Sequence, residues 1–199
     1  MTKGRLEAFS DGVIAVIITI MVLELVAPHE PGVDALHRLT PVMLSYVLSY
    51  VFIGIYWSNH HHLFQVVQHI DGRVLWANLH LLFWLSLVPF ATAWMGETHF
   101  AGTPVAVYGA VLLMAGVAYF ILTLVLLTLH DQDSKLAVAL RSNTKEKLSV
   151  AFYGAAVSAA FWQPAVSCAI YVVVAIMWLV PDRRIERTMH EKGPGFPDR

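Results

Sequence analysis

The stretch Arg5-Leu6-Glu7-Ala8-Phe9-Ser10-Asp11 and the apolar run Val13–Leu23 that follows it decide the fold of this chain. A helix needs about 20 mostly apolar residues to cross a bilayer, and the segment of about residues 9–27 meets this length. Three charged residues crowd its beginning, and charges at membrane depth are costly unless they face protein, water or one another. The stretch therefore predicts a membrane-spanning helix whose charged first turns have a task of their own.

The composition supports a membrane protein. Of 199 residues, 57% are hydrophobic and only 14% are charged, whereas soluble domains carry about 25% charged residues. The net charge of −1 argues against a nucleic-acid partner, which would need a basic face. Cys168 is the only cysteine, which excludes a disulfide framework and a thiolate metal site.

Hydropathy and helix-breaking residues divide the chain into six expected spans. Pro28 ends the first span, and Gln163-Pro164 divides the long apolar stretch at the end of the chain. We expect an all-α integral membrane protein with one transmembrane domain, residues 1–181, and a charged cytoplasmic tail, residues 182–199. The expected spans are about residues 9–27, 39–57, 74–95, 105–129, 148–162 and 165–180.

The loop charges predict the orientation. With six spans, both termini and the loops after the second and fourth spans lie on one side of the membrane. Twelve of the thirteen Lys and Arg residues fall on that side, and Arg38 is the exception. Since positive residues concentrate in cytoplasmic loops, both termini are expected in the cytoplasm.

A helical projection of the first span separates an apolar face from the charged residues. At 100° per residue, Thr19, Ile20 and Leu23 lie within about 60° of Val16, whereas Asp11 lies about 140° away. This geometry predicts that the helix has two functional parts, a mostly apolar face and a polar base anchored into neighbouring helices. An ordinary packed helix would also show such a stripe, and in that interpretation Val16, Ile20 and Leu23 belong to the core.

The charged residues of this helix also allow two interpretations each. Asp11 and Arg5 form either an interfacial ion pair that fixes the helix end or part of a functional site. Glu24 either reaches the outer interface or attracts cations there.

Other candidate sites are weaker. His60-His61-His62 suggests a metal site, but adjacent helical residues point about 100° apart and cannot all bind one ion. A polar, pH-responsive end of the second span is favoured for these histidines. No catalytic pair of residues is evident, so we expect neither an enzyme, nor a cofactor, nor a bound metal.

Two segments resemble the transmembrane protein 175 family, the endosomal and lysosomal potassium channels and their prokaryotic homologues. The first is Arg-x-x-x-Phe-Ser-Asp at residues 5–11, with Thr19 eight residues after Asp11. The second, Asn-Leu-His-Leu-Leu-Phe-Trp-Leu-Ser-Leu-Val-Pro-Phe-Ala-Thr at residues 78–92, is similar to the third helix of the prokaryotic members. The likeness extends over about residues 5–180.

The resemblance implies a homotetrameric channel with six helices per subunit, its pore lined by the first helix of each subunit. Its hydrophobic constriction would lie at Val16, with Ile20 and Leu23 next, and either Val16 or Leu23 could form the tightest layer. Thr19 would supply pore hydroxyls, and Glu24 would attract cations at the outer mouth. The chain has no Thr-Val-Gly-Tyr-Gly carbonyl filter, so potassium would pass through this constriction.

The resemblance also implies a polar network at the cytoplasmic end of the first helix. Four residues of this helix match it: Arg5, Phe9, Ser10 and Asp11. The third helix offers three possible partners: Trp76, Asn78 and His80.

The expected function is passive conduction of potassium across the bacterial inner (plasma) membrane. The alternative is a small proton-coupled secondary transporter that uses Asp11, Glu24 and His80. Transporters often bind substrate at broken helices, and the first span contains no proline.

Overall fold

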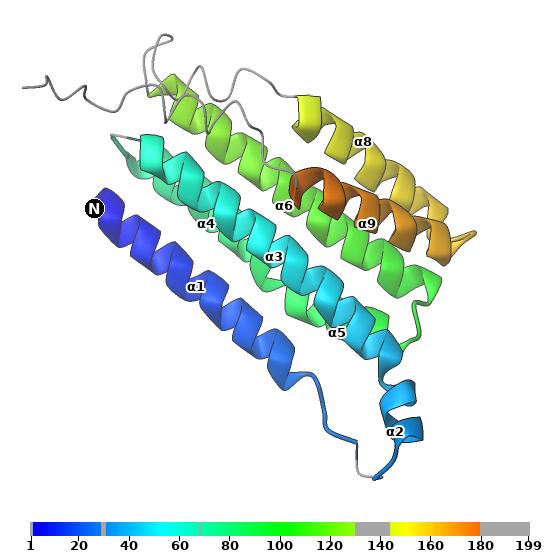
Figure 1. The fold of residues 1–199 in the computed structure, drawn as a ribbon. Coiled ribbons are helices and arrows are strands. Elements are labelled where there is room, and N and C mark those ends of the chain that lie inside the picture. Colours follow the sequence, from blue (N-terminus) through cyan, green and yellow to red (C-terminus); the bar gives the residue numbers. More distant parts are fainter. Residues whose placement is uncertain (1, 29–30, 68, 130–143, 180–199) are drawn as a thin grey trace, which may run out of the picture.

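The computed structural model describes residues 2–28, 31–67, 69–129 and 144–179, and all regular structure in these ranges is helical. The expected all-α class is confirmed, while the expected tail 182–199 lies outside the described residues. The helices are α1 (Lys3–Leu23), α2 (Val33–Arg38), α3 (Thr40–Val66), α4 (Gly72–Ser86), α5 (Val88–Glu97), α6 (Gly102–Thr128), α8 (Thr144–Ala159) and α9 (Pro164–Leu179) (Figure 1).

Four segments of the described chain are long and apolar enough to cross a membrane: Lys3–Leu23, Thr40–Gln65, Gly72–Glu97 and Gly102–Thr128. Their mean hydropathies are 2.1, 1.4, 1.6 and 2.6. Pro164–Leu179 is a shorter apolar helix. The first helix begins at Lys3, six residues before the expected span, so the charged motif lies within α1.

The third expected span, about residues 74–95, is divided into α4 and α5 at Leu87. Pro89 causes the break because it has no amide hydrogen to donate to the Leu85 carbonyl one turn earlier. The break thus separates Asn78, on α4, from Thr92, on α5.

The helices lie roughly parallel, with α1 at one edge and the α8–α9 pair at the other (Figure 1). Between them, buried hydroxyl groups join α3, α5 and α6. The Ser49 and Thr92 hydroxyls are 2.7 Å apart, and Ser49 Oγ bonds Tyr108 Oη at 3.0 Å. Such hydrogen bonds hold helices together in lipid, where hydrophobic burial alone does not favour one helix over a lipid tail.

The helix α1 packs on α3, α4 and α5 through one stripe. The buried members of this stripe are Leu6, Ser10, Ile14, Ile17 and Met21. Only 28% of the most apolar part of α1 is buried, compared with 50% for Gly72–Glu97. Outside this stripe, Val16, Ile20, Val22 and Leu23 are exposed in the single chain.

Glycines allow two of the helix pairs to approach closely. At Gly102 of α6, a Cβ would lie 2.6 Å from the carbonyl oxygen of Ala160, the residue after α8. At Gly109, a Cβ would meet the Tyr171 hydroxyl of α9, which donates to the Val105 carbonyl at 3.0 Å. Small residues at these crossings therefore set how the α8–α9 pair sits on α6.

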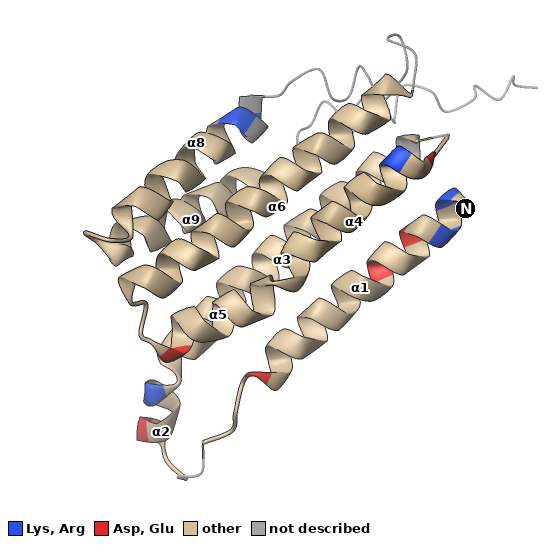
Figure 2. Cartoon of the chain, turned by 180° about the vertical axis from the view of Figure 1, so that it is seen from behind, with Lys and Arg blue, Asp and Glu red and all other residues tan. Residues whose placement is uncertain are grey.

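Charges are confined to helix ends, except along the first turns of α1 (Figure 2). The helices α3, α6 and α9 contain no Asp, Glu, Lys or Arg. At the start of α4, Asp71 accepts from Arg73 Nε at 2.8 Å and from the Val74 amide at 3.0 Å. The side chain of Arg73, then the Val74 amide, hold the pKa of Asp71 below its usual range.

We expect Gly109→Ala to destabilise the chain by about 1–3 kcal/mol, because the new methyl group overlaps the Tyr171 hydroxyl and overpacks the α6–α9 contact. Thermal unfolding in detergent measures the change. Gly154→Ala is the matched control, since nothing lies within 4 Å of a Cβ there. Equal melting temperatures for the two variants would show that this crossing tolerates a larger residue.

Candidate functional site

A buried chain of hydrogen bonds joins α1 to α4 and α3. Ser10 Oγ donates to the Leu6 carbonyl at 2.9 Å and accepts from Asn78 Nδ2 at 2.9 Å. Asn78 Oδ1 lies 2.8 Å from His60 Nε2. Because the Asn78 amide nitrogen is used on Ser10, its oxygen has to accept, and His60 Nε2 carries the proton.

The three side chains of this bridge are buried, with His60 stacked on Phe64 at a ring-centroid distance of 4.5 Å. Each polar side chain thus exchanges water for protein partners of fixed geometry. A buried polar group left without a partner costs about 1–3 kcal/mol. The bridge therefore fixes both the depth and the rotation of α1 against its neighbours.

Asp11, the residue after Ser10, is hydrogen-bonded by a different helix. Trp57 Nε1 of α3 donates to Asp11 Oδ1 at 3.1 Å, and the Trp57 ring stacks on His61. Consecutive residues of the motif are thus anchored by two different helices, Ser10 by α4 and Asp11 by α3. The anchor as we define it comprises Ser10, Asp11, Trp57, His60 and Asn78.

The other residues expected in this network lie outside the anchor. Arg5 and Phe9 are exposed on α1. Trp76 is 75% exposed, and His80 accepts from Trp84 Nε1 at 3.0 Å within α4. Of the three partners expected from the third helix, the structure brings Asn78 to α1 and places Trp76 and His80 elsewhere.

Sequence reasoning missed His60 and Trp57 as partners of the motif. Helical phase could have found His60, because it lies at i+4 from Tyr56 and i−4 from Phe64, whereas His61 and His62 leave that stripe. Within the described residues there is no group of three or more His, Cys, Asp and Glu that could hold a metal.

The face of α1 that carries Val16 is turned away from the rest of the chain. Val16 is 56% exposed, Ile20 41% and Leu23 73%. The buried stripe of α1 consists of other residues, so this face is not part of the core of the single chain. It is an apolar surface on an otherwise anchored helix.

Two polar residues border this face. The Thr19 hydroxyl donates to the Ala15 carbonyl at 3.0 Å. Its hydrogen is therefore used inside the helix, and the lone pairs of its oxygen are left for an outside partner such as a cation. Glu24 caps the far end of α1 and is exposed.

The fold and these contacts define an α-helical integral membrane protein whose first helix is anchored at one end and bears an uncovered apolar face. The sequence model of the endosomal/lysosomal potassium channel TMEM175 matches residues 5–89, which contain all but the first two residues of α1 and every residue of the anchor. The chain is 51% identical over 191 residues to a potassium channel of Chryseobacterium sp. (strain P1-3), covering 96% of this chain and 100% of the relative.

Two further comparisons agree. The endosomal/lysosomal proton channel TMEM175 of Gallus gallus is 33% identical over 103 residues, which cover 46% of this chain and 21% of that protein. The crystal structure of a lysosomal potassium-selective channel TMEM175 homolog from Chamaesiphon minutus matches with a TM-score of 0.79 and 27% identity, covering 92% of this chain and 97% of that one. The chain belongs to the TMEM175 family.

We expect Asn78→Leu to destabilise the chain by about 2 kcal/mol or more, because it leaves His60 Nε2 without its buried acceptor and Ser10 without its donor. Thermal unfolding in detergent measures this change. Ser86→Ala on the same helix is the control, since it removes an exposed hydroxyl that bonds only within its own turn. A melting temperature unchanged by Asn78→Leu would show that the bridge does not fix α1.

Proposed function

We propose that this chain forms a homotetrameric, potassium-permeable cation channel of the bacterial plasma membrane and conducts ions passively down their electrochemical gradient. Six membrane crossings per subunit would be made by α1, α3, the α4–α5 pair, α6, α8 and α9. The relative from Chryseobacterium and the homologue from Chamaesiphon carry potassium channel names, which supports this function.

The observation that carries the proposal is the uncovered face of α1. An anchored helix with buried contacts on one stripe and exposed Val16, Ile20 and Leu23 on another has a surface that only other molecules can cover. Four such helices around a common axis would place these residues in a ring. Lipid tails could also cover an apolar face, and the exposed hydroxyl of Thr19 within it favours a wet path.

A ring of apolar side chains gates ion flow by controlling whether water fills the pore. When the ring is narrow, water leaves it, and an ion must lose its hydration shell to pass. A small rotation or outward movement of the helices restores water and lowers this barrier. The anchor at Ser10 and Asp11 lies below the constriction and would limit such rotation.

Selectivity in this arrangement would come from the constriction and from Thr19. Hydroxyl oxygens facing the pore would replace part of the hydration shell, and potassium loses its shell more readily than sodium does. The preference for potassium would be modest because no ring of backbone carbonyls takes part. The permeant ion is the one ligand that the function requires.

The charges of the described residues support cytoplasmic termini. Three cationic residues lie at the first turns of α1 and α4, at the same end of the bundle: Lys3, Arg5 and Arg73. Arg38, on α2, lies at the opposite end (Figure 2). Positive residues favour the cytoplasmic side.

The secondary-transporter alternative is not favoured. Its residues Asp11 and Glu24 are thirteen positions apart on one helix, about 20 Å along its axis. The helix α1 runs unbroken from Lys3 to Leu23, without the mid-membrane break of many transporters. His80 is engaged by Trp84 of its own helix.

We expect Val16→Ala to raise single-channel conductance about tenfold and to weaken the preference for potassium over sodium, since a barrier lower by about 1.4 kcal/mol has that effect. Recordings from purified protein in planar bilayers, with potassium, sodium and pH gradients applied in turn, measure both quantities. The pH gradient also separates potassium from proton conduction, the activity named for the vertebrate relatives.

Val22→Ala is the matched control for this experiment. Val22 is the same residue type on the same helix and is 46% exposed, but it lies about 120° from Val16 around the axis. If both substitutions leave the conductance unchanged, or change it equally, this face of α1 does not line the pore. Flux that requires a proton gradient would show that the protein is a transporter and not a channel.

We expect Glu24→Gln to lower potassium conductance about twofold at 0.01 M salt and to have no effect at 1 M, because the Debye length falls from about 30 Å to about 3 Å. Glu97→Gln removes the same charge at the end of α5, at the same end of the bundle, and should have a smaller effect at 0.01 M salt because it does not lie on the helix of the proposed pore. An effect of Glu24→Gln that persists at 1 M salt would contradict a role in cation attraction.

A further inference from the structure

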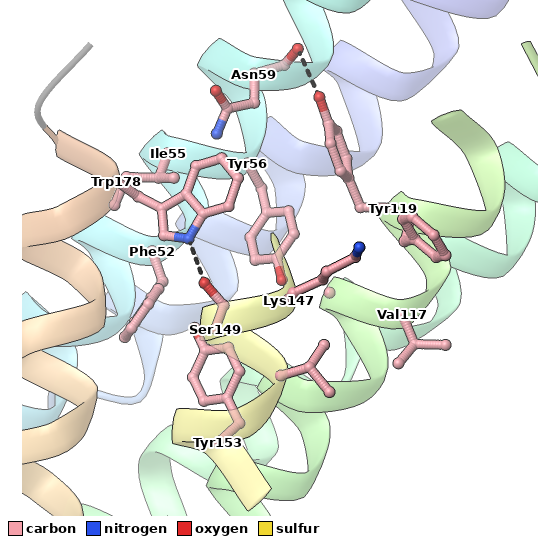
Figure 3. Close-up of a pocket in the computed structure, with 13 residues that line it drawn as sticks. Phe52, Ile55, Tyr56, Asn59, Val117, Tyr119, Lys147, Ser149, Tyr153 and Trp178 are labelled. Atoms are coloured by element: carbon pink, nitrogen blue, oxygen red, sulfur yellow. Dashed lines mark hydrogen bonds between the residues drawn. The ribbon is translucent and has the colours of Figure 1, made fainter. Parts of the chain in front are cut away.

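A cavity of about 250 Å³ lies between α3, α6, α8 and α9, and no residue of the anchor or of the exposed face of α1 lines it (Figure 3). Its walls are mainly aromatic and aliphatic. They include Phe52, Ile55 and Tyr56 of α3, Val117 and Phe120 of α6, and Tyr153 of α8. Lys147, in the first turn of α8, is the cationic residue among the lining residues.

The polar atoms of the walls are mostly engaged with one another. Trp178 Nε1 donates to Ser149 Oγ at 2.8 Å, and Tyr119 Oη donates to the Asn59 carbonyl at 3.3 Å. A ligand would therefore meet an apolar interior and one ammonium group at its border. Such a site suits a hydrocarbon chain with an anionic end, because most of its wall is apolar.

The position of Lys147 along the bundle indicates the membrane depth of the cavity. The end of α8 meets the start of α6, where Gly102 approaches Ala160. Since α8 has 16 residues and α6 has 27, α8 stops short of the far end of α6. Lys147 lies beside Gly116–Phe120, about 12–18 Å from that end.

A lysine at this depth requires an anionic partner or water. An ammonium group in the hydrocarbon region is unfavourable by at least about 2.5 kcal/mol, unless it reaches the interface or is paired. Lys147 is exposed, and the described residues provide no ion pair for it. The helices α8 and α9, which supply part of the cavity wall, lie at the edge of the subunit remote from α1 (Figure 1).

We propose that this cavity binds one acyl chain of an anionic phospholipid and that Lys147 pairs with the phosphate of its headgroup. At about 30 Å³ per water-sized group, the volume holds about eight methylene-sized groups, half of an ordinary acyl chain. A helix, about 10 Å across, does not fit this volume. Phospholipid is the amphiphile present at this depth in any bilayer, and the charge of Lys147 selects its anionic members.

Native mass spectrometry of the purified full-length protein tests the proposal. The protein is titrated with phosphatidylglycerol or with phosphatidylcholine of identical chains, and the fraction of subunits retaining one lipid is measured. We expect phosphatidylglycerol to bind about fivefold more tightly, the effect of about 1 kcal/mol for one lysine near anionic lipid. Lys147→Gln should abolish this preference, and Lys147→Arg should keep it.

Two variants test whether lipid binding depends on the cavity or on surface charge in general. Gly116→Leu fills the cavity, because only the Tyr56 hydroxyl, at 3.7 Å, lies near a Cβ at this position, and it should reduce binding of both lipids. Lys145→Gln removes the same charge two residues earlier and is not among the lining residues. An equal loss in Lys145→Gln and Lys147→Gln would overturn the proposal, as would equal binding of the two lipids.

Free fatty acid provides a further discriminating arm. Oleate shares the acyl chain and the negative charge of the proposed occupant but lacks the glycerol phosphate. If oleate displaces phosphatidylglycerol at equal concentration, the occupant of the cavity is a fatty acid and not a phospholipid. Binding is measured without ion flux, so its failure leaves the proposed channel untouched, and failure of the channel leaves the lipid site untouched.

Discussion

The hydrogen bond between Asn78 and Ser10 holds this structure to one arrangement, because α1 has little else to fix it. The stripe from Leu6 to Met21 supplies apolar contact, which lets a helix slide and rotate at little cost in lipid. A bond of 2.9 Å to an amide that is itself tied to His60 allows one register. With the second tie from Trp57 to Asp11, α1 is oriented by α3 and α4 together, and the direction of its exposed face follows from these contacts.

The helix α1 has two functions, one served by the anchor and the other by its exposed face. Polar residues specify position, and apolar residues provide a surface whose hydration can change. An ordinary soluble domain would bury Val16, Ile20 and Leu23 and expose the charges of the motif. Here the arrangement is reversed for the apolar residues, since 41–73% of each is exposed while Ser10 is fully buried. Such a reversal is stable only where lipid, another subunit or a narrow column of water meets the face.

The sequence could predict the helices better than their contacts. Apolar runs and prolines predicted where helices lie, because hydrophobicity and the missing proline amide act locally. The bounds differ most at the start of α1, six residues before the expected span, and at the end of α3, nine residues after it. The separation of Val16 from Asp11 followed from helical periodicity. The partners of Ser10 and Asp11 could not be deduced in this way, since they depend on how α3 and α4 rotate. For His60, helical phase could distinguish the buried histidine from its two neighbours, but only tertiary packing shows that its partner is Asn78.

The break at Leu87 gives the subunit a joint between two differently attached pieces. The piece before it, α4, is bonded to α1 through Asn78, and the piece after it, α5, is bonded to Ser49 of α3 through Thr92. Because Pro89 has no amide hydrogen, bending at this point sacrifices no bond to the Leu85 carbonyl. This bend lets one segment of the chain serve two sets of neighbours, since α4 packs on α6 and holds α1 through Asn78, whereas α5 packs mainly on α3.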